Sequence, residues 1–224
     1  MQEINYSEVE FEDTEIRCPA VLLLDTSSSM SGAPIMELNK GLKALSDQLK
    51  ENDVARRRIE VALITFNSNV DVINDFVRSD ELKISEFETS GLTKMGTAIN
   101  KGLDLIEARK TSYKNNGILY YRPWMFMITD GEPQGEDENV IIEASKRIAS
   151  YEENKKVIFF SIGVQNANMR KLKEISYRPP YKLEGLKFEE LFKWISNSIQ
   201  SVVTESNPGE QKILDKPDII EVVV

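Results

Sequence analysis

The chain has 224 residues, with 28 basic and 37 acidic side chains and a formal net charge of −9. That length fits one domain with a substantial core, and the acidic balance disfavours nucleic acid and anionic membrane surfaces as partners. Histidine is absent, which excludes Ser-His-Asp and Cys-His catalysis and any metal site built on histidine.

The first 17 residues alternate acidic and apolar positions in the stretch SEVEFEDTEI. We predict an N-terminal acidic arm over residues 1–17, either as an edge strand or without order. The arm lacks the apolar core of a secretory signal, and no apolar run reaches transmembrane length, so we expect a cytoplasmic protein with no membrane contact. Cys18 is the single cysteine, so we expect a reduced thiol packed at the start of the first core strand.

The first core strand is predicted over residues 18–26, and it ends in a loop rich in oxygen atoms. Its unbroken apolar run is typical of a strand buried on both faces. Asp25, Ser27 and Ser29 then alternate, which in an extended segment points their side chains the same way. Such hard oxygen donors favour Mg²⁺ or Mn²⁺ over Zn²⁺. The residues alone leave one alternative open, in which Asp25 caps a turn and the serines fill a loop.

Strands and helices alternate along the rest of the chain. Apolar spacing predicts helices over residues 35–51, 94–109, 136–151, 167–176 and 187–203. Further strands are predicted over residues 59–67, 70–77, 122–130 and 156–164, with a short sixth strand within 177–186. The basic run at 56–58 is interpreted as a solvated turn. The tail, 205–224, ends in the apolar sequence IIEVVV, which could add a strand by pairing with the N-terminal arm or with another chain.

Two later segments carry further oxygen donors. Thr93 stands in SGLTKMGTAI, just before a predicted helix, where capping is the structural alternative to a binding role. Asp130 ends a predicted strand in WMFMITDGEP. The acidic residues that follow are expected to rim the same face, and the last three of them to open the next helix: Glu132, Glu136, Asp137 and Glu138.

These three segments, in order, resemble the metal-ion-dependent adhesion motif of von Willebrand factor type A (vWA) domains. The first segment, VLLLDTSSSMSG, is the most similar. The resemblance implies Mg²⁺ or Mn²⁺ bound by side chains of all three segments, with one position open to a Glu or Asp of a protein partner; these side chains are Asp25, Ser27, Ser29, Thr93 and Asp130. Ser28 and Leu92 stand where the family often has glycine, and neither is a ligand position.

The predicted fold class is α/β, with a mostly parallel central sheet, one antiparallel edge strand at 70–77 and helices on both faces. The resemblance implies a Rossmann-like vWA sandwich over residues 18–204. The segments LITFNSNV, MITDGEP and LEGLKFEELFKWISNSIQSV also resemble the bacterial tellurite-resistance Y-type (TerY-like) subfamily. That similarity implies an intracellular scaffold in a stress-response complex.

Binding is favoured over catalysis, with two alternatives kept. An aspartate at the end of a first strand also resembles Mg²⁺-dependent phosphatases of the haloacid-dehalogenase type, but those proteins have a second aspartate where this chain has Ser27. No general acid is evident either. A vWA subunit of a chelatase or ATPase complex would need no change in the site. We therefore predict a protein that is not an enzyme and that binds a protein partner through its metal.

Overall fold

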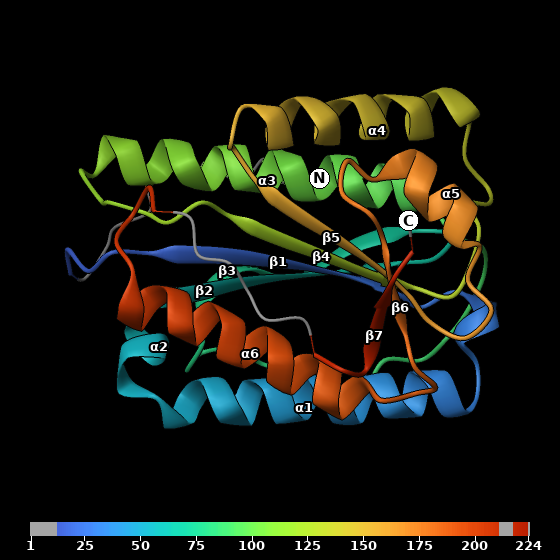
Figure 1. Ribbon diagram of the computed structural model, residues 1–224, viewed down its shortest axis with the longest axis horizontal. Helices are drawn as coiled ribbons and strands as arrows, with labels where there is room; N and C mark the ends of the chain where they lie inside the picture. Colours follow the sequence, from blue (N-terminus) through green and yellow to red (C-terminus); the bar gives the residue numbers. More distant parts are fainter. Residues whose placement is uncertain (1–12, 211–216, 224) are drawn as a thin grey trace.

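The computed structural model describes residues 13–210 and 217–223 (Figure 1). One seven-stranded sheet has the order β3-β2-β1-β4-β5-β6-β7. Its strands are β1 (Cys18–Asp25), β2 (Ile59–Phe66), β3 (Val70–Arg78), β4 (Trp124–Thr129), β5 (Ile158–Gly163), β6 (Tyr181–Leu183) and β7 (Ile220–Val222). The helices are α1 (Ala33–Glu51), α2 (Asp53–Arg58), α3 (Met95–Asn115), α4 (Glu138–Glu153), α5 (Met169–Ile175) and α6 (Phe188–Glu205), with a 3-10 turn at Ser28–Met30.

The predicted α/β class with a mostly parallel sheet is confirmed. Strands β1, β2, β4, β5 and β6 pair in parallel, and β3 pairs antiparallel with β2 as predicted for the edge strand. The tail adds a second antiparallel edge, because β7 pairs with β6. The expected partners of the tail, the N-terminal arm or another chain, are therefore wrong, because Ile220–Val222 pair with β6 of the same chain.

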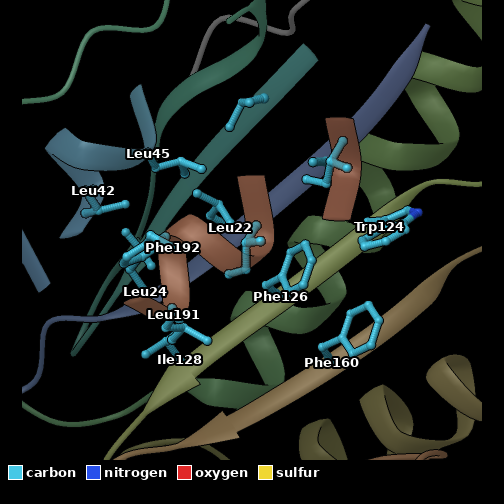
Figure 2. Packing of buried hydrophobic residues seen from close by; sticks show 14 of the residues in the cluster. Leu22, Leu24, Leu42, Leu45, Trp124, Phe126, Ile128, Phe160, Leu191 and Phe192 are labelled. Carbon is cyan, nitrogen blue, oxygen red and sulfur yellow. The ribbon is translucent and has the colours of Figure 1, made fainter. Parts of the chain in front are cut away.

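Strand β1 is buried along its whole length, and its side chains alternate between two cores. Leu22 and Leu24 pack with residues of α1 and α6, whereas Val21 and Leu23 pack with residues of α3 and α4. Figure 1 shows α1, α2 and α6 on one face of the sheet and α3, α4 and α5 on the other. Figure 2 shows the first core, where Leu22 and Leu24 lie beside side chains of both covering helices.

Two local predictions are wrong. The basic run at 56–58 belongs to helix α2 instead of a turn, because the Asn52 side chain caps that helix by accepting from the amides of Val54 and Ala55. Helix α3 continues to Asn115, beyond the predicted end at 109, because Tyr113 in its last turns is fully buried and donates a hydrogen bond to Glu60. Both segments are rich in polar residues, so the apolar spacing does not reveal these helical turns.

The predicted acidic arm, 1–17, lies outside the described residues up to position 12. The described end of the arm is fixed by Arg17, which is 2% exposed. Its guanidinium lies 2.6 Å from the carboxylate of Asp13 and 3.2 Å from that of Glu60. Within the described residues no helix has both the length and the apolar character needed to cross a bilayer.

The Cys18 thiol is expected to be unreactive in the native protein. The residue is 0% exposed, and burial raises the pKa of the thiol to about 12, so thiolate is scarce near neutral pH. The measurement is labelling by an aromatic disulfide reagent at pH 8, with and without denaturant. Labelling should occur at the rate of global unfolding in the native protein and within seconds in denaturant. Fast native labelling would contradict this burial.

Candidate metal centre

The candidate site lies at the carboxyl ends of β1 and β4, where the chain leaves neighbouring strands toward opposite sides of the sheet. Strand β1 lies between β2 and β4, so its carboxyl end meets that of β4. Asp25 is the last residue of β1, and Asp130 directly follows β4. Leu24 is paired with Ile128, which brings Asp25 level with Thr129. In open parallel sheets such a switch point is the usual place for a ligand.

A chain of hydrogen bonds links the predicted donors of the first and third segments. The backbone amide of Ser27 donates to Asp25 Oδ1 at 2.8 Å, which fixes the turn after β1. The hydroxyls of Ser27 and Ser29 lie 2.9 Å apart. Ser29 Oγ then donates to Asp130 Oδ1 at 2.7 Å. These side chains lie together as predicted, but the segment is not extended, because residues Ser28–Met30 form a 3-10 turn that brings the two serine hydroxyls side by side.

Thr93 reaches the site through backbone pairing with the loop after β4. Its amide donates to the carbonyl of Gln134 at 3.2 Å, and the amide of Gln134 donates back to the carbonyl of Thr93 at 2.9 Å. Thr93 does not cap α3. The residue at the N-cap position is Lys94, and its side chain makes no capping hydrogen bond. The structural alternative for Thr93 is thus wrong, and its side chain is buried.

The open space beside Gly131 shows how closely the three segments approach. A β-carbon placed on Gly131 would lie 3.6 Å from Thr93 Oγ1, 3.8 Å from Ser29 Oγ and 3.9 Å from Asp25 Oδ2. Two oxygen atoms of the first segment and one of the second thus lie around a point beside Gly131 of the third segment, and no side chain fills that point. Hydroxyl and carboxylate donors around such a space fit Mg²⁺ or Mn²⁺. Within the described residues no group of three or more acidic, histidine or cysteine side chains is placed to hold a metal ion, so this fit depends on the hydroxyls.

The electrostatics of the two carboxylates favour a cation. Burial raises the pKa of Asp25 to about 6; hydrogen bonds from Ser27 and Thr129 oppose this effect, and the nearby charge of Asp130 adds to it. Burial also raises the pKa of Asp130, against the hydrogen bond from Ser29. No described lysine or arginine forms an ion pair with either carboxylate. A buried charge beside a half-buried one, without a counter-ion, is costly, and a divalent cation would relieve that cost.

Sequence reasoning missed two positioning residues. Thr129 Oγ1 donates to Asp25 Oδ2 at 2.6 Å, a contact that becomes visible only once β1 and β4 are known to be neighbours. Glu136 accepts from the amides of Gly96 and Thr97 at 2.7 and 2.9 Å, and from the Thr97 hydroxyl. It therefore caps α3 in place of Thr93 and ties the loop after Asp130 to the Thr93 segment.

The expected acidic rim is engaged in internal contacts. Glu136 does not open α4; that helix begins at Glu138 and is capped by Asp137, which accepts from the amide of Asn139 at 2.8 Å. Glu138 lies 3.3 Å from the ammonium group of Lys171. Glu132 accepts a hydrogen bond from Asn168. These four acids are therefore largely occupied by caps and pairs instead of forming an open ring of charge.

The two departures from the glycine pattern cause no backbone strain. Neither Ser28 nor Leu92 has a positive φ. Gly91 takes the left-handed conformation instead, with φ of +71°, and its carbonyl accepts from the Ser28 amide at 3.1 Å. Gly91 thus makes the tight turn one residue before Leu92.

Comparison with known proteins identifies the family of the fold. The family model described as the von Willebrand factor type A domain matches residues 20–193. The chain belongs to the von Willebrand factor type A family. Domains of this family are generally protein-interaction or adhesion modules. The predicted domain limits of 18 and 204 stay a prediction.

Solved structures share the vWA fold at low identity. A von Willebrand factor type A protein from Catenulispora acidiphila has a TM-score of 0.67 and 14% identity over 83% of this chain and 43% of its own. The pilus adhesin SpaC from Lactobacillus rhamnosus GG has a TM-score of 0.62 and 12% identity over 86% and 30%. The PilB minor pilin from Streptococcus sanguinis has a TM-score of 0.59 and 14% identity over 86% and 63%.

The chain thus spans less than two thirds of the length of each of these structures. No curated protein sequence matches it.

Asp25→Asn is expected to stabilise the metal-free protein at high pH. The folded pKa of about 6 lies above the ordinary value of 3.8, so the contribution of Asp25 to the unfolding free energy falls as the pH rises from about 4 to about 6. Above that range the charged form costs on the order of 2–3 kcal/mol. The variant removes the charge and keeps one acceptor oxygen.

The measurement is urea unfolding with a chelator present. Asp25→Asn should gain roughly 1–3 kcal/mol over wild type at pH 8 and little at pH 4. Asp47→Asn, an exposed change on α1, is the matched control and should stay within about 0.5 kcal/mol. A loss of stability at pH 8 in Asp25→Asn would show that the buried charge is compensated in some other way.

Glu136→Ala is expected to destabilise the fold by about 2 kcal/mol, because it removes a charged cap and its hydrogen bonds. Glu138→Ala is the matched control, since its pair with Lys171 is exposed and worth less than about 1 kcal/mol. The urea midpoints of the two variants show whether Glu136 stabilises the fold more than the exposed Glu138 pair does. Equal effects would mean that the Glu136 contacts do not tie the loop to α3.

Proposed function

We propose that this chain is a metal-dependent protein-binding module. One Mg²⁺ or Mn²⁺ would be held by Asp25, Ser27, Ser29, Thr93 and Asp130. The observation that carries the proposal is the convergence of oxygen atoms of Asp25, Ser29 and Thr93, from two segments, around the point beside Gly131 of the third. When bound, the ion supplies a concentrated positive charge with a place for a carboxylate oxygen.

The chain's own residues position the site and limit what reaches it. Asp25 is 0% exposed, so it balances charge from beneath, whereas Ser29 is exposed at the surface. Leu92, beside Thr93, is 46% exposed, and Met36 near the start of α1 is 58% exposed. We propose that a partner places a Glu or Asp on the metal and packs apolar side chains near these two residues.

The proposed partner is acidic only at the point of contact. The net charge of −9 opposes an acidic ligand, but this repulsion is spread out and is screened beyond roughly 8 Å at physiological salt. The ion acts at contact distance. The neighbouring acids already hold internal partners, so they add less repulsion than an open acidic rim would.

A non-catalytic role is part of the proposal. The described site holds no lysine or arginine paired with Asp25 or Asp130, and the chain has no histidine, so a general acid–base partner is lacking. The finer assignment, an intracellular scaffold of the TerY-like type in a stress-response complex, is proposed on the segments that resemble that subfamily. A phosphatase-like hydrolase and a chelatase or ATPase subunit are the alternatives.

The test is capture of partners from the native lysate by immobilised protein, with Mg²⁺ or with a chelator. A specific partner should be retained with Mg²⁺ and lost with the chelator, and its affinity for Asp25→Asn should fall by tens- to thousands-fold, the equivalent of about 2–5 kcal/mol for one half of a desolvated charge contact. Asp47→Asn should bind like wild type. A partner indifferent to both chelator and Asp25→Asn would place binding elsewhere. Metal-dependent phosphoester hydrolysis lost in Asp25→Asn would favour the phosphatase.

A further inference from the structure

A second hollow lies at the opposite end of the sheet from the candidate metal centre. It has a volume of about 690 Å³, within the range of small-molecule sites. Trp124 and Ile158, the first residues of β4 and β5, line it. The rise of β4 puts Trp124 roughly 17 Å from Thr129 beside Asp25. The hollow is therefore separate from the proposed binding site.

Aromatic side chains form one part of the lining. Trp124 and Phe160 lie on neighbouring strands with ring centroids 5.6 Å apart, on the same face of the sheet (Figure 2). Phe160 is stacked on Tyr181 at 6.0 Å. Tyr120 is half-buried and also lines the hollow. Trp124 and Phe160 are only 3% and 7% exposed, so the open aromatic surface of the hollow comes from the partly buried Tyr120 and Tyr181.

Basic side chains form the other part. Within the described residues the lining holds six lysines and arginines but a single acid, Glu210, although the chain as a whole is acidic. Lys114 at the end of α3 and Lys155 after α4 are exposed and form no ion pair with a described side chain. This concentration of positive charge is opposite in sign to the rest of the molecule.

Two arginines of the lining share one buried carboxylate. The side chain of Glu152 is 0% exposed and lies 2.7 Å from the guanidinium of Arg122 and 2.8 Å from that of Arg178. One negative charge between two guanidinium groups leaves a net positive charge, and the Arg178 side chain is 43% exposed. Arg178 is thus held in place by Glu152 and still open to an anion.

The simplest structural explanation of these cations covers only part of the observations. Lysines near helix C-termini interact favourably with the negative end of the helix dipole, which accounts for Lys114 and Lys155. It requires neither an aromatic lining nor a hollow. Phosphates with an attached ring would use all three features at once.

We propose that this hollow binds a phosphorylated aromatic small molecule of nucleotide size. Its ring would pack on the partly exposed rings of Tyr120 and Tyr181. Its phosphates would lie among Lys114, Lys155 and Arg178. Binding would not depend on the metal centre, so the two proposals can fail separately.

ATP is the probe, with adenosine and tripolyphosphate as its two halves, titrated calorimetrically with a chelator present throughout. Both tryptophans of the chain lie at or near the hollow, since Trp194 packs edge-on against Phe160 at 6.1 Å, so their fluorescence should change on binding. ATP should bind at least tenfold more tightly than either half. Asp25→Asn should bind ATP like wild type.

The matched pair is Lys114→Glu and Lys101→Glu, two exposed lysines of α3 of which only the first lines the hollow. Lys114→Glu should weaken ATP binding at least tenfold and Lys101→Glu less than twofold. Absence of ATP binding at millimolar concentration would overturn the proposal. So would equal losses in the two variants, tripolyphosphate binding as tightly as ATP, or a loss of ATP binding in Asp25→Asn.

Discussion

The Asp25 carboxylate is fully buried at the end of the central strand, with a second carboxylate nearby and no described basic side chain paired to it. Taking such a charge out of water costs several kcal/mol unless something compensates it. Hydrogen bonds from the Ser27 amide and the Thr129 hydroxyl compensate in part, and the pKa of Asp25 still rises to about 6. The loops around Asp25 present oxygen atoms to one shared point, and a cation bound there would balance the remaining negative charge.

The sheet order creates this situation. Strand β1 can carry an unbroken apolar run because α1 and α6 cover one face and α3 and α4 the other. The same central position places its end beside that of β4, so Asp25 and Asp130 become neighbours although they are 105 residues apart in the sequence. Glu136, in the loop after Asp130, caps α3 with contacts of 2.7 to 2.9 Å and so holds the Thr93 segment against that loop. Fold and candidate site are thus stabilised by the same contacts.

Local patterns were enough to predict much of this arrangement. The apolar run and the alternation of Asp25, Ser27 and Ser29 locate the first strand and its loop, and the resemblance to vWA motifs adds Thr93 and Asp130. Features that depend on contacts between distant segments could not be predicted. Thr129 and Glu136 acquire their roles only through neighbouring strands and loops, and the pairing of β7 depends on where the tail returns. The occupied acidic rim is a further case, because its partners lie on other elements.

Charge is distributed unevenly between the two ends of the sheet. The carboxyl end gathers two aspartates and three hydroxyls, whereas the amino end carries lysines and arginines around an aromatic hollow. A net charge of −9 conceals this contrast, since it averages over both ends. In the two proposals taken together, the molecule would bind a cation at one end of the sheet and an anion at the other.

The most direct test of the account is calorimetric titration of Mn²⁺ into chelator-treated protein, comparing two serines of the same loop. Ser29 belongs to the converging set, whereas Ser31, two residues further on, is exposed and outside it. Wild type and Ser31→Ala should each bind one ion with similar affinity, and Ser29→Ala should bind at least tenfold more weakly, which corresponds to about 1.4 kcal/mol. Equal affinities for all three proteins, or no binding by wild type, would contradict the claim that these oxygens form a metal site.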